Sequence, residues 1–313
     1  MRTRVLYMGT AELACPPLVA LHASPVADVV GVVTQPDRPG GRKLKPQPSP
    51  VKQCALGLGL PVIQPQTLRI PEALKQLAAF EADLFIVTAY GQILPQTALD
   101  IPTHGALNIH GSLLPRHRGA APIQWAILEG DAETGITLMR MDAGLDTGGM
   151  IATAKTPITK TDTAETLHDR LAEMGAALLT QSLSGILDGT LTPVPQDDSQ
   201  STYARKIIKQ DGQINWTQPA KKIHRQWRAF TPWPGIYTEL PTGKNRLLKI
   251  QAAEISPAKG KAGEVLSVDE NGILIGCGEQ SLNLVKLQRE GGRSLNAAEF
   301  LNGYPLQAGQ RLG

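Results

Sequence analysis

The first two thirds of the chain alternate between short apolar runs and longer segments with helical spacing. The apolar runs predict strands at residues 4–8, 26–34, 82–89, 105–109 and 135–141. The segments between them carry helical periodicity, for example at residues 50–60 and in the Ala- and Leu-rich stretch 163–187. Strands that alternate with crossover helices predict an α/β domain with a Rossmann-like, doubly wound and mostly parallel sheet.

The pattern changes near residue 189, where Gly, Pro, Asp and Ser residues form a polar, turn-rich segment. A helical stretch at 218–230 follows, and then short strands are predicted at 247–252, 263–268, 272–276 and 281–287. Short strands with glycine-containing turns predict a small β-barrel. We therefore predict a first domain at 1–189, a linker at 190–206 and a second domain at 207–313.

Composition narrows the class of protein. A chain of 313 residues with 42% hydrophobic residues is large enough for about two domains. It contains no apolar run of the roughly 20 residues that a membrane helix needs, and no secretory pattern at its start, so we expect a cytoplasmic protein. The first strand ends at Gly9 without a GxGxxG motif, which argues against a dinucleotide-dependent dehydrogenase.

The cysteines indicate neither a disulfide framework nor a zinc site. Cys15, Cys54 and Cys277 are far apart in the sequence, odd in number and without metal-ligand spacing. We expect bystander thiols and no metal ion.

Positive charge is concentrated towards the end of the sequence. Residues 205–313 hold 16 Lys and Arg against 9 Asp and Glu, whereas residues 1–204 hold 15 against 19. This asymmetry is typical of a domain that holds a phosphate backbone, and the alternative is a solvated basic surface. Another basic segment lies in the Pro- and Gly-rich stretch 36–50, where we expect a long, functional loop; its charged residues are Arg38, Arg42, Lys43 and Lys45.

The strongest chemical signal is the stretch NIHGSLLPRHRG at 108–119, followed by DAGLDTGG at 142–149. In an extended segment Asn108 and His110 project to the same face. His110 could take a proton from an attacking amine, Asn108 could stabilise a developing oxyanion, and Asp146 could orient the imidazole. Each residue also has a structural reading, as a loop amide, a buried histidine or a turn-capping aspartate. Together they indicate acyl transfer to an amine.

The region 108–150 resembles the catalytic region of the folate-dependent formyltransferases, with Ser112-Leu113-Leu114-Pro115 as their fingerprint. The resemblance extends to RVLYMGTAELACPPL near the start, ADLFIVTAYGQILP at 82–95 and RAFTPWPGIYT at 228–238. It places the family's catalytic Asn, His and Asp on Asn108, His110 and Asp146. The implied reaction moves a formyl group from 10-formyltetrahydrofolate to the amino group of methionine carried on initiator tRNA.

The resemblance also implies binding residues. The folate is expected against segments 89–94, 112–115 and 142–146, including Ala89, Tyr90, Gly91, Ser112, Leu113, Leu114 and Pro115. The tRNA is expected against Arg38, Arg42, Lys43, Lys45, Lys206 and Lys209, with a C-terminal OB-like domain and Arg42 as the foremost contact. No stable protein partner is expected. One position departs from the family pattern: Asn215 stands where an acidic residue is common, which puts a local contact in doubt.

Two alternatives remain open. The same three residues would serve a formyltransferase that acts on a small amine, such as an amino sugar linked to a nucleotide or glycinamide ribonucleotide. A non-catalytic RNA-binding protein with a degenerate enzyme fold is a different class. The basic segments argue against the first alternative, and the intact Asn108, His110 and Asp146 argue against the second.

Overall fold

The computed structural model describes residues 2–40, 45–242 and 246–313, and the chain divides into two compact units. The first unit comprises Met1–Pro122, Glu133–Pro157 and Leu167–Arg205, and the second comprises Ile123–Ala132, Ile158–Thr166 and Lys206–Gly313. None of the described helices is both long and apolar enough to cross a membrane.

The first unit is built on a seven-stranded sheet with the order β10-β9-β7-β6-β1-β2-β5. These strands are β1 (Thr3–Gly9), β2 (Ala27–Val33), β5 (Val62–Ile63), β6 (Leu84–Thr88), β7 (Ala106–His110), β9 (Glu133–Arg140) and β10 (Met150–Pro157). The strands from β5 to β7 run parallel, whereas β9 and β10 add an antiparallel edge. The predicted parallel-dominated sheet is confirmed.

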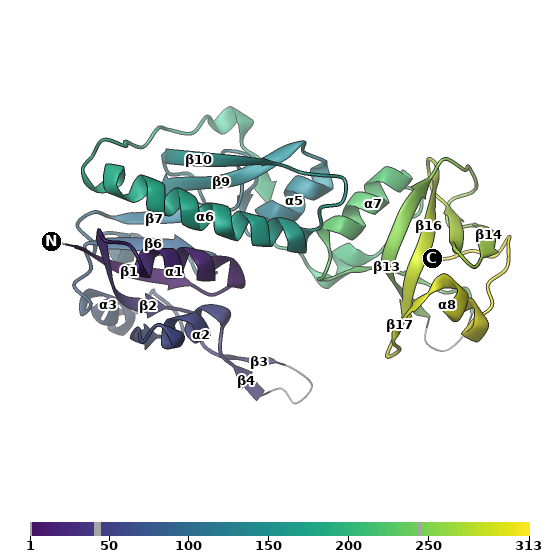
Figure 1. Cartoon of the computed structure of the whole chain (residues 1–313), viewed down its shortest axis with the longest axis horizontal. Helices are drawn as coiled ribbons and strands as arrows, with labels where there is room; N and C mark the ends of the chain where they lie inside the picture. Colours follow the sequence, from purple (N-terminus) through teal and green to yellow (C-terminus); the bar gives the residue numbers. More distant parts are fainter. Residues whose placement is uncertain (1, 41–44, 243–245) are drawn as a thin grey trace. The chain divides into compact units, whose positions relative to one another are not determined.

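Helices cover both faces of this sheet. One face carries α1 (Cys15–His22) and α6 (Ala164–Leu187), which lie beside the strands in Figure 1. Gly175 brings α6 close to β7, because a Cβ atom there would lie 3.1 Å from the Ile109 side chain. Leu6 and Met8 of β1 join the core on the other face with residues of α3 (Pro71–Ala78) and α4 (Gln96–Leu99). Helices on both faces are what a doubly wound sheet requires.

Two further helices begin at a proline, as α3 does. They are α2 (Pro50–Gly57) and α5 (Pro122–Glu129). Proline suits a first helical position, because its missing N–H would have no intrahelical partner there. Pro122 accordingly starts α5.

The basic segment 36–50 contains two short paired strands where a long loop was expected. Arg38–Gly40 (β3) pairs antiparallel with Lys45–Gln47 (β4). Arg42 and Lys43 lie outside the described residues. The hairpin places Arg38 and Lys45 on neighbouring strands.

The segment predicted as a linker, 190–206, returns along the first unit. Val194 and Met150 exchange backbone hydrogen bonds of 2.8 Å. A short 3-10 helix, η2 (Asp198–Gln200), follows, and β11 (Tyr203–Ala204) pairs parallel with β8 (Arg118–Gly119). Most of the segment thus belongs to the folded first unit.

The second unit contains an antiparallel sheet with the order β12-β13-β16-β15-β14, and β17 pairs with β16. Its elements are η3 (Lys209–Gly212), α7 (Ala220–Ala229), β12 (Ile236–Glu239), β13 (Leu247–Ser256), β14 (Val265–Asp269), β15 (Gly272–Gly276), β16 (Ser281–Arg289), β17 (Ser294–Asn296) and α8 (Ala297–Gly303). Register shifts in β13 and β14 mark bulges, which bend a sheet. The predicted barrel-like second fold is confirmed.

Candidate functional site

Asn108 and His110 lie near the carboxyl end of β7, and the predicted folate segments 89–94 and 112–115 follow β6 and β7. Gly9 of β1 pairs with Thr88 of β6, and Val87 pairs with Asn108 of β7. The loops after β6 and β7 therefore leave the same edge of the sheet. In open α/β sheets this edge is where ligands bind.

The structure brings the three predicted catalytic residues together. The side-chain Nδ2 of Asn108 donates to Asp146 Oδ1 at 3.2 Å. The other carboxylate oxygen, Oδ2, accepts a 2.8 Å hydrogen bond from the backbone N–H of Gly119 and lies 3.6 Å from His110 Nδ1. The Asp146 carboxylate is thus the centre of the cluster.

The imidazole of His110 is held on its other side. Its Nε2 lies 3.0 Å from the backbone carbonyl oxygen of His117, and the residue is only 5% exposed. Because a carbonyl only accepts, Nε2 must donate, and the neutral ring then leaves Nδ1 unprotonated. At 3.6 Å from Asp146 Oδ2, Nδ1 is beyond normal hydrogen-bond distance. A proton taken up at Nδ1 would face a carboxylate.

The loop that follows His110 is fixed from within. Ser112 is fully buried and its hydroxyl donates to the carbonyl of Arg116 at 2.7 Å. Thr137 of β9 donates to the Ser112 carbonyl at 2.7 Å and accepts from the Leu114 N–H at 3.1 Å. The predicted fingerprint segment is therefore a rigid loop, with Ser112 satisfying its backbone.

The predicted folate residues divide into buried and accessible ones. The side chains of Tyr90, Ser112 and Leu114 are buried, whereas Ala89 and Gly91 are exposed. Leu113 and Pro115 are half-buried. Ala89 has φ +45° and Gly91 has φ +79°, which places the turn after β6 in the left-handed region. Ile93 and Leu145, in the wider segments, are exposed apolar side chains at 65% and 51%.

Gln35 connects the basic hairpin to the turn after β6. Its Nε2 donates to the carbonyl of Tyr90 at 2.8 Å, and its Oε1 accepts from the guanidinium of Arg38. At the base of the hairpin Lys52 forms an ion pair of 2.8 Å with Asp37. That hydrogen bond, together with one from Gln64, holds the pKa of Asp37 below its ordinary value.

Two polar residues that were not among the predicted catalytic or binding residues, Gln196 and Arg118, organise the cluster. Gln196 Nε2 donates to the carbonyls of Asp146 and Gly148 at 2.8 and 2.7 Å. Gln196 Oε1 accepts from Nε and Nη2 of Arg118 at 3.0 and 2.8 Å, and Arg118 also contacts Asp198 at 2.7 Å. Gln196 stands in a polar, turn-rich stretch, so its sequence context carried no signal.

The predicted tRNA residues that the structure describes are exposed. Arg38 and Lys45 lie on the hairpin, and Lys206 and Lys209 lie at the start of the second unit's main segment. Two other basic residues of the second unit are engaged internally. Arg225 of α7 donates to the carbonyl of Glu129 at 3.1 Å, and Arg228, 8% exposed, donates to the carbonyls of Thr159 and Asp162 at 2.9 and 3.1 Å.

Asn215, the position that departs from the family pattern, caps its own turn. Asn215 Oδ1 accepts from the backbone N–H of Thr217 at 3.0 Å and from its hydroxyl at 2.7 Å. An amide oxygen supplies the acceptor that a carboxylate would supply. The neighbouring Trp216 is buried and its Nε1 donates to Thr238 Oγ1 at 3.0 Å, whereas Trp233 is 58% exposed.

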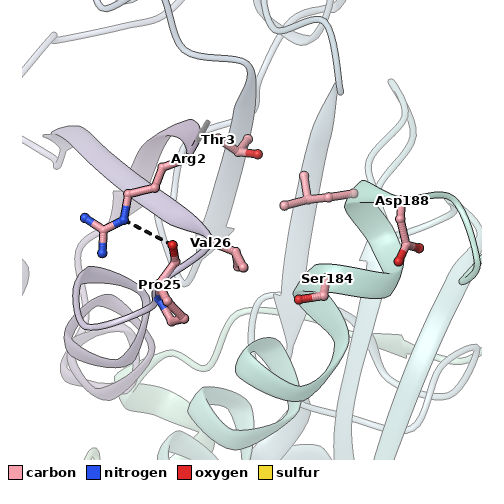
Figure 2. Close-up of a pocket in the computed structure, with 7 residues that line it drawn as sticks. Arg2, Thr3, Pro25, Val26, Ser184 and Asp188 are labelled. Atoms are coloured by element: carbon pink, nitrogen blue, oxygen red, sulfur yellow. Dashed lines mark hydrogen bonds between the residues drawn. The ribbon is translucent and has the colours of Figure 1, made fainter.

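A cavity of about 650 Å³ lies elsewhere on the first unit (Figure 2). It is lined by Arg2 and Thr3 at the start of β1, by Pro25 and Val26, and by Ser184, Leu187 and Asp188 near the end of α6. Figure 2 shows the Arg2 guanidinium turned to the Pro25 carbonyl, to which Nε donates at 3.1 Å. None of the predicted site residues that the structure describes lines it.

Across the described ranges, no three His, Cys, Asp or Glu side chains gather in a group that could hold a metal ion. Cys15 and Cys54 are half-buried, and burial raises the pKa of the Cys15 thiol to about 12. At neutral pH this thiol is protonated and therefore a poor ligand and nucleophile.

Two family descriptions match the chain: "Formyl transferase" over residues 1–183 and "Formyl transferase, C-terminal domain" over residues 206–305. The methionyl-tRNA formyltransferase of Pseudomonas savastanoi pv. phaseolicola is 50% identical over 299 residues, which cover 96% of this chain and 94% of the relative. That of Geobacter metallireducens is 47% identical over 309 residues, which cover 99% and 98%.

Solved structures share the fold at lower identity. WlaRD, a sugar 3N-formyl transferase crystallised with dTDP and 5-N-formyl-THF, has a TM-score of 0.65 and 21% identity over 91% of this chain and 98% of that one. HypX from Aquifex aeolicus, in complex with tetrahydrofolic acid, has a TM-score of 0.63 and 17% identity over 98% of this chain. The chain spans about half the length of HypX, 49%.

Proposed function

Because the chain belongs to the formyl transferase family, we propose that it transfers the formyl group of 10-formyltetrahydrofolate to the amino group of methionine on initiator tRNA. Relatives at about 50% identity over nearly the whole chain carry the name of this activity. The observation that carries the chemistry is the cluster of Asn108, His110 and Asp146. Asn108 Nδ2 donates to Asp146 Oδ1 at 3.2 Å, and His110 Nδ1 lies 3.6 Å from Asp146 Oδ2. The initiator-tRNA substrate assigns the reaction to translation initiation in the cytoplasm.

In this proposal His110 is the proton acceptor. The amine of methionine is itself the nucleophile and must lose a proton as it adds to the formyl carbon. Since Nε2 of His110 is fixed by the His117 carbonyl, Nδ1 is the free basic position. The Asp146 carboxylate at 3.6 Å stabilises the resulting imidazolium. The proton then passes from His110 to the departing folate nitrogen.

Asn108 is proposed to stabilise the formyl oxygen. One of its two amide hydrogens donates to Asp146 Oδ1, which fixes the orientation of the side chain. The second hydrogen is available to the oxygen that becomes negative when the amine adds. A fixed donor lowers the barrier because it does not reorganise during the reaction.

We propose that the folate binds at the edge of the sheet formed by the loops after β6 and β7. The left-handed turn of Ala89 and Gly91 exposes backbone groups suited to the polar edge of a pterin. The exposed apolar side chains of Ile93 and Leu145 would serve as its walls. The buried Tyr90, Ser112 and Leu114 support these loops from below, and Leu113 and Pro115 complete the second loop.

The tRNA is proposed to contact exposed basic side chains. Those that the structure describes are Arg38 and Lys45 on the hairpin and Lys206 and Lys209 in the second unit. Arg42 and Lys43, which lie between Arg38 and Lys45 in the sequence, are proposed to contact the tRNA as well. A basic surface holds phosphates without reading bases. This acceptor is favoured over an amino sugar by the charge of residues 205–313 and by the names of the relatives.

The test is a formylation assay with purified protein and 10-formyltetrahydrofolate. Three acceptors are compared: methionyl initiator tRNA, free methionine and a nucleotide-linked amino sugar. We expect formylmethionyl-tRNA as the main product. Transfer only to the sugar would refute the acceptor and keep the chemistry, whereas no transfer to any amine would refute the proposed enzyme.

A further inference from the structure

We infer that Gln196 is a positioning residue, which holds the Asp146 carboxylate in register with His110. It touches neither the imidazole nor Asn108. Its amide group instead joins the two loops that carry the candidate site, one after β7 and one between β9 and β10. The inference rests on the proposed function, because the role it assigns is to support that reaction.

The backbone around Asp146 needs external support. Asp146 has φ +54°, in the left-handed region, where a non-glycine residue carries strain. Its neighbours Gly144, Leu145 and Thr147 are exposed, so packing does little to hold this turn. An exposed turn with an unfavourable backbone angle stays in place only when other contacts determine it.

Gln196 supplies such contacts at two points of the turn. The two hydrogens of its Nε2 group are directed to the carbonyls of Asp146 and Gly148, at 2.8 and 2.7 Å. One side chain thereby fixes the backbone at Asp146 and two residues later. Within residues 188–200 Gln196 is half-buried, and all the remaining residues are exposed.

The other end of the amide is anchored on the loop after β7. Gln196 Oε1 receives two hydrogen bonds from Arg118, at 3.0 and 2.8 Å. The next residue, Gly119, donates its N–H to Asp146 Oδ2 at 2.8 Å. Gln196 and the Asp146 carboxylate therefore bridge the same two loops side by side. Loss of the Gln196 bridge would leave the carboxylate to hold the loops alone.

The backbone of Gln196 is itself fixed on both sides. Val194 forms paired hydrogen bonds with Met150, the first residue of β10, at 2.8 Å. Further along, the N–H of His117 donates to the hydroxyl of Thr202 at 2.8 Å, and Ala204 accepts from Ala120 at 2.8 Å. The segment 193–204 is thus attached to both loops, and Gln196 is its inward contact at the cluster.

The experiment compares Gln196→Ala and Gln196→Glu with a control, Gln200→Ala. The Glu variant keeps an oxygen that accepts from Arg118. It replaces the Nε2 donor with a second carboxylate oxygen, which cannot donate to the carbonyls of Asp146 and Gly148. Gln200 lies in the same segment, is exposed, and its side chain donates to the exposed Asp197 at 3.3 Å. We expect both Gln196 variants to lower kcat by about 100-fold, the loss that a displacement of about 1 Å causes, with KM for both substrates within about threefold. Gln200→Ala should match the wild type.

A double-mutant cycle separates positioning from general damage. If Gln196 acts through Asp146, then Gln196→Ala should cause little further loss in an Asp146→Asn background, measured in single turnovers. The inference would be overturned if the rate losses of Gln196→Ala and Asp146→Asn multiplied in the double variant. It would also be overturned if Gln196→Ala kept the wild-type kcat, or if Gln200→Ala lost as much activity as Gln196→Ala.

The role of Gln196 can be tested even if the protein does not formylate methionyl-tRNA. If the wild type formylates a different amine, the same cycle is run with that amine. If it formylates none, hydrogen exchange of the amides 144–148 is compared between wild type and Gln196→Ala. Faster exchange in the variant would support the positioning role, and unchanged exchange would overturn it.

Discussion

At the scale of single residues, the candidate site depends on how one carboxylate is shared. Asp146 receives Asn108 on one oxygen and Gly119 on the other, and the second oxygen also faces His110. The nearly complete burial of His110 limits the competition of water with these contacts. In such surroundings an electrostatic interaction is stronger than in bulk solvent.

His110→Ala tests the assigned proton transfer. We expect kcat to fall about 10²- to 10⁴-fold, the range typical for loss of a general base. The affinity for 10-formyltetrahydrofolate, measured by calorimetry, should stay within about threefold, because the change removes the proton acceptor and leaves the proposed folate residues in place. His104→Ala, an exposed histidine two residues before β7, is the control and should behave as wild type. An equal loss of folate affinity would contradict the role.

The sequence allowed Asn108 and His110 to be predicted as neighbours on one face, because alternation along a strand determines side-chain direction. Asp146 was found only through its motif and the family resemblance, since nothing local places a residue 36 positions away next to an imidazole. Gln196 was missed altogether. Its partners are backbone carbonyls and an arginine from distant segments, and such contacts leave no periodic pattern in a polar stretch.

At the scale of elements, α7 shows that basic residues can serve structural contacts where the sequence suggests RNA binding. The helix was predicted from its periodicity, and its arginines were counted towards a surface for RNA. Arg225 and Arg228 instead donate to backbone carbonyls of residues 129, 159 and 162. Those segments precede α7 by more than 50 residues, so a charge count could not separate structural arginines from exposed ones.

Arg228→Met should destabilise the second unit. Hydrogen bonds from a charged donor contribute roughly 1.5–3 kcal/mol, and the two carbonyls lose their charged donor while the methylene stem is replaced. We expect a loss of about 2 kcal/mol in the free energy of unfolding, measured by urea denaturation. Lys222→Ala, an exposed position of the same helix, should change it by less than about 0.5 kcal/mol. Equal stability of the two variants would show that the Arg228 contacts contribute nothing.

The strand β15 ends beside a thiol that makes stability depend on pH. Burial raises the pKa of the Cys277 thiol from 9.0 to about 11. Between these values the unfolded chain loses the proton while the folded chain keeps it, so stability falls as pH rises, by at most about 1.4 kcal/mol per pH unit for one group. In Cys277→Ala the melting temperature should fall less steeply between pH 9 and 11. Between pH 7 and 8 the two curves should run parallel, and identical slopes above pH 9 would contradict the assignment.

Element boundaries were predicted best where periodicity is strong. The strand at 272–276 and the helix at 163–187 agree with β15 and α6 to within a residue. The hairpin of β3 and β4 was not expected, because proline and glycine dominate its sequence and indicate a loop. Its strands are three residues long, too short for alternation to appear.

At the scale of the whole molecule, charge separates the parts of the chain. The excess of basic residues in 205–313 remains after Arg225 and Arg228 are set aside, since 14 Lys and Arg then face 9 Asp and Glu. Lys206 and Lys209 lie at the start of this stretch and are exposed. A nucleic acid held by such groups releases counterions, and its binding weakens as salt increases.

Binding of tRNA should therefore follow a steep salt dependence. The logarithm of Kd is measured against the logarithm of salt concentration, by filter binding. Lys209→Ala should reduce the slope by about 1, as expected for the loss of one phosphate contact. Lys75→Ala, an exposed lysine of α3, should leave the slope unchanged. A flat response in the wild type would remove the basic stretch from the proposal.

The path of residues 193–204 decides where the protein can be divided. A recombinant fragment that stopped after α6, at Leu187, would contain Asn108, His110 and Asp146. It would nevertheless lack Gln196, Thr202 and β11, which hold the loops on which those residues stand. For truncation, fusion or split-protein engineering, a fragment that carries the candidate site therefore has to extend at least to Arg205.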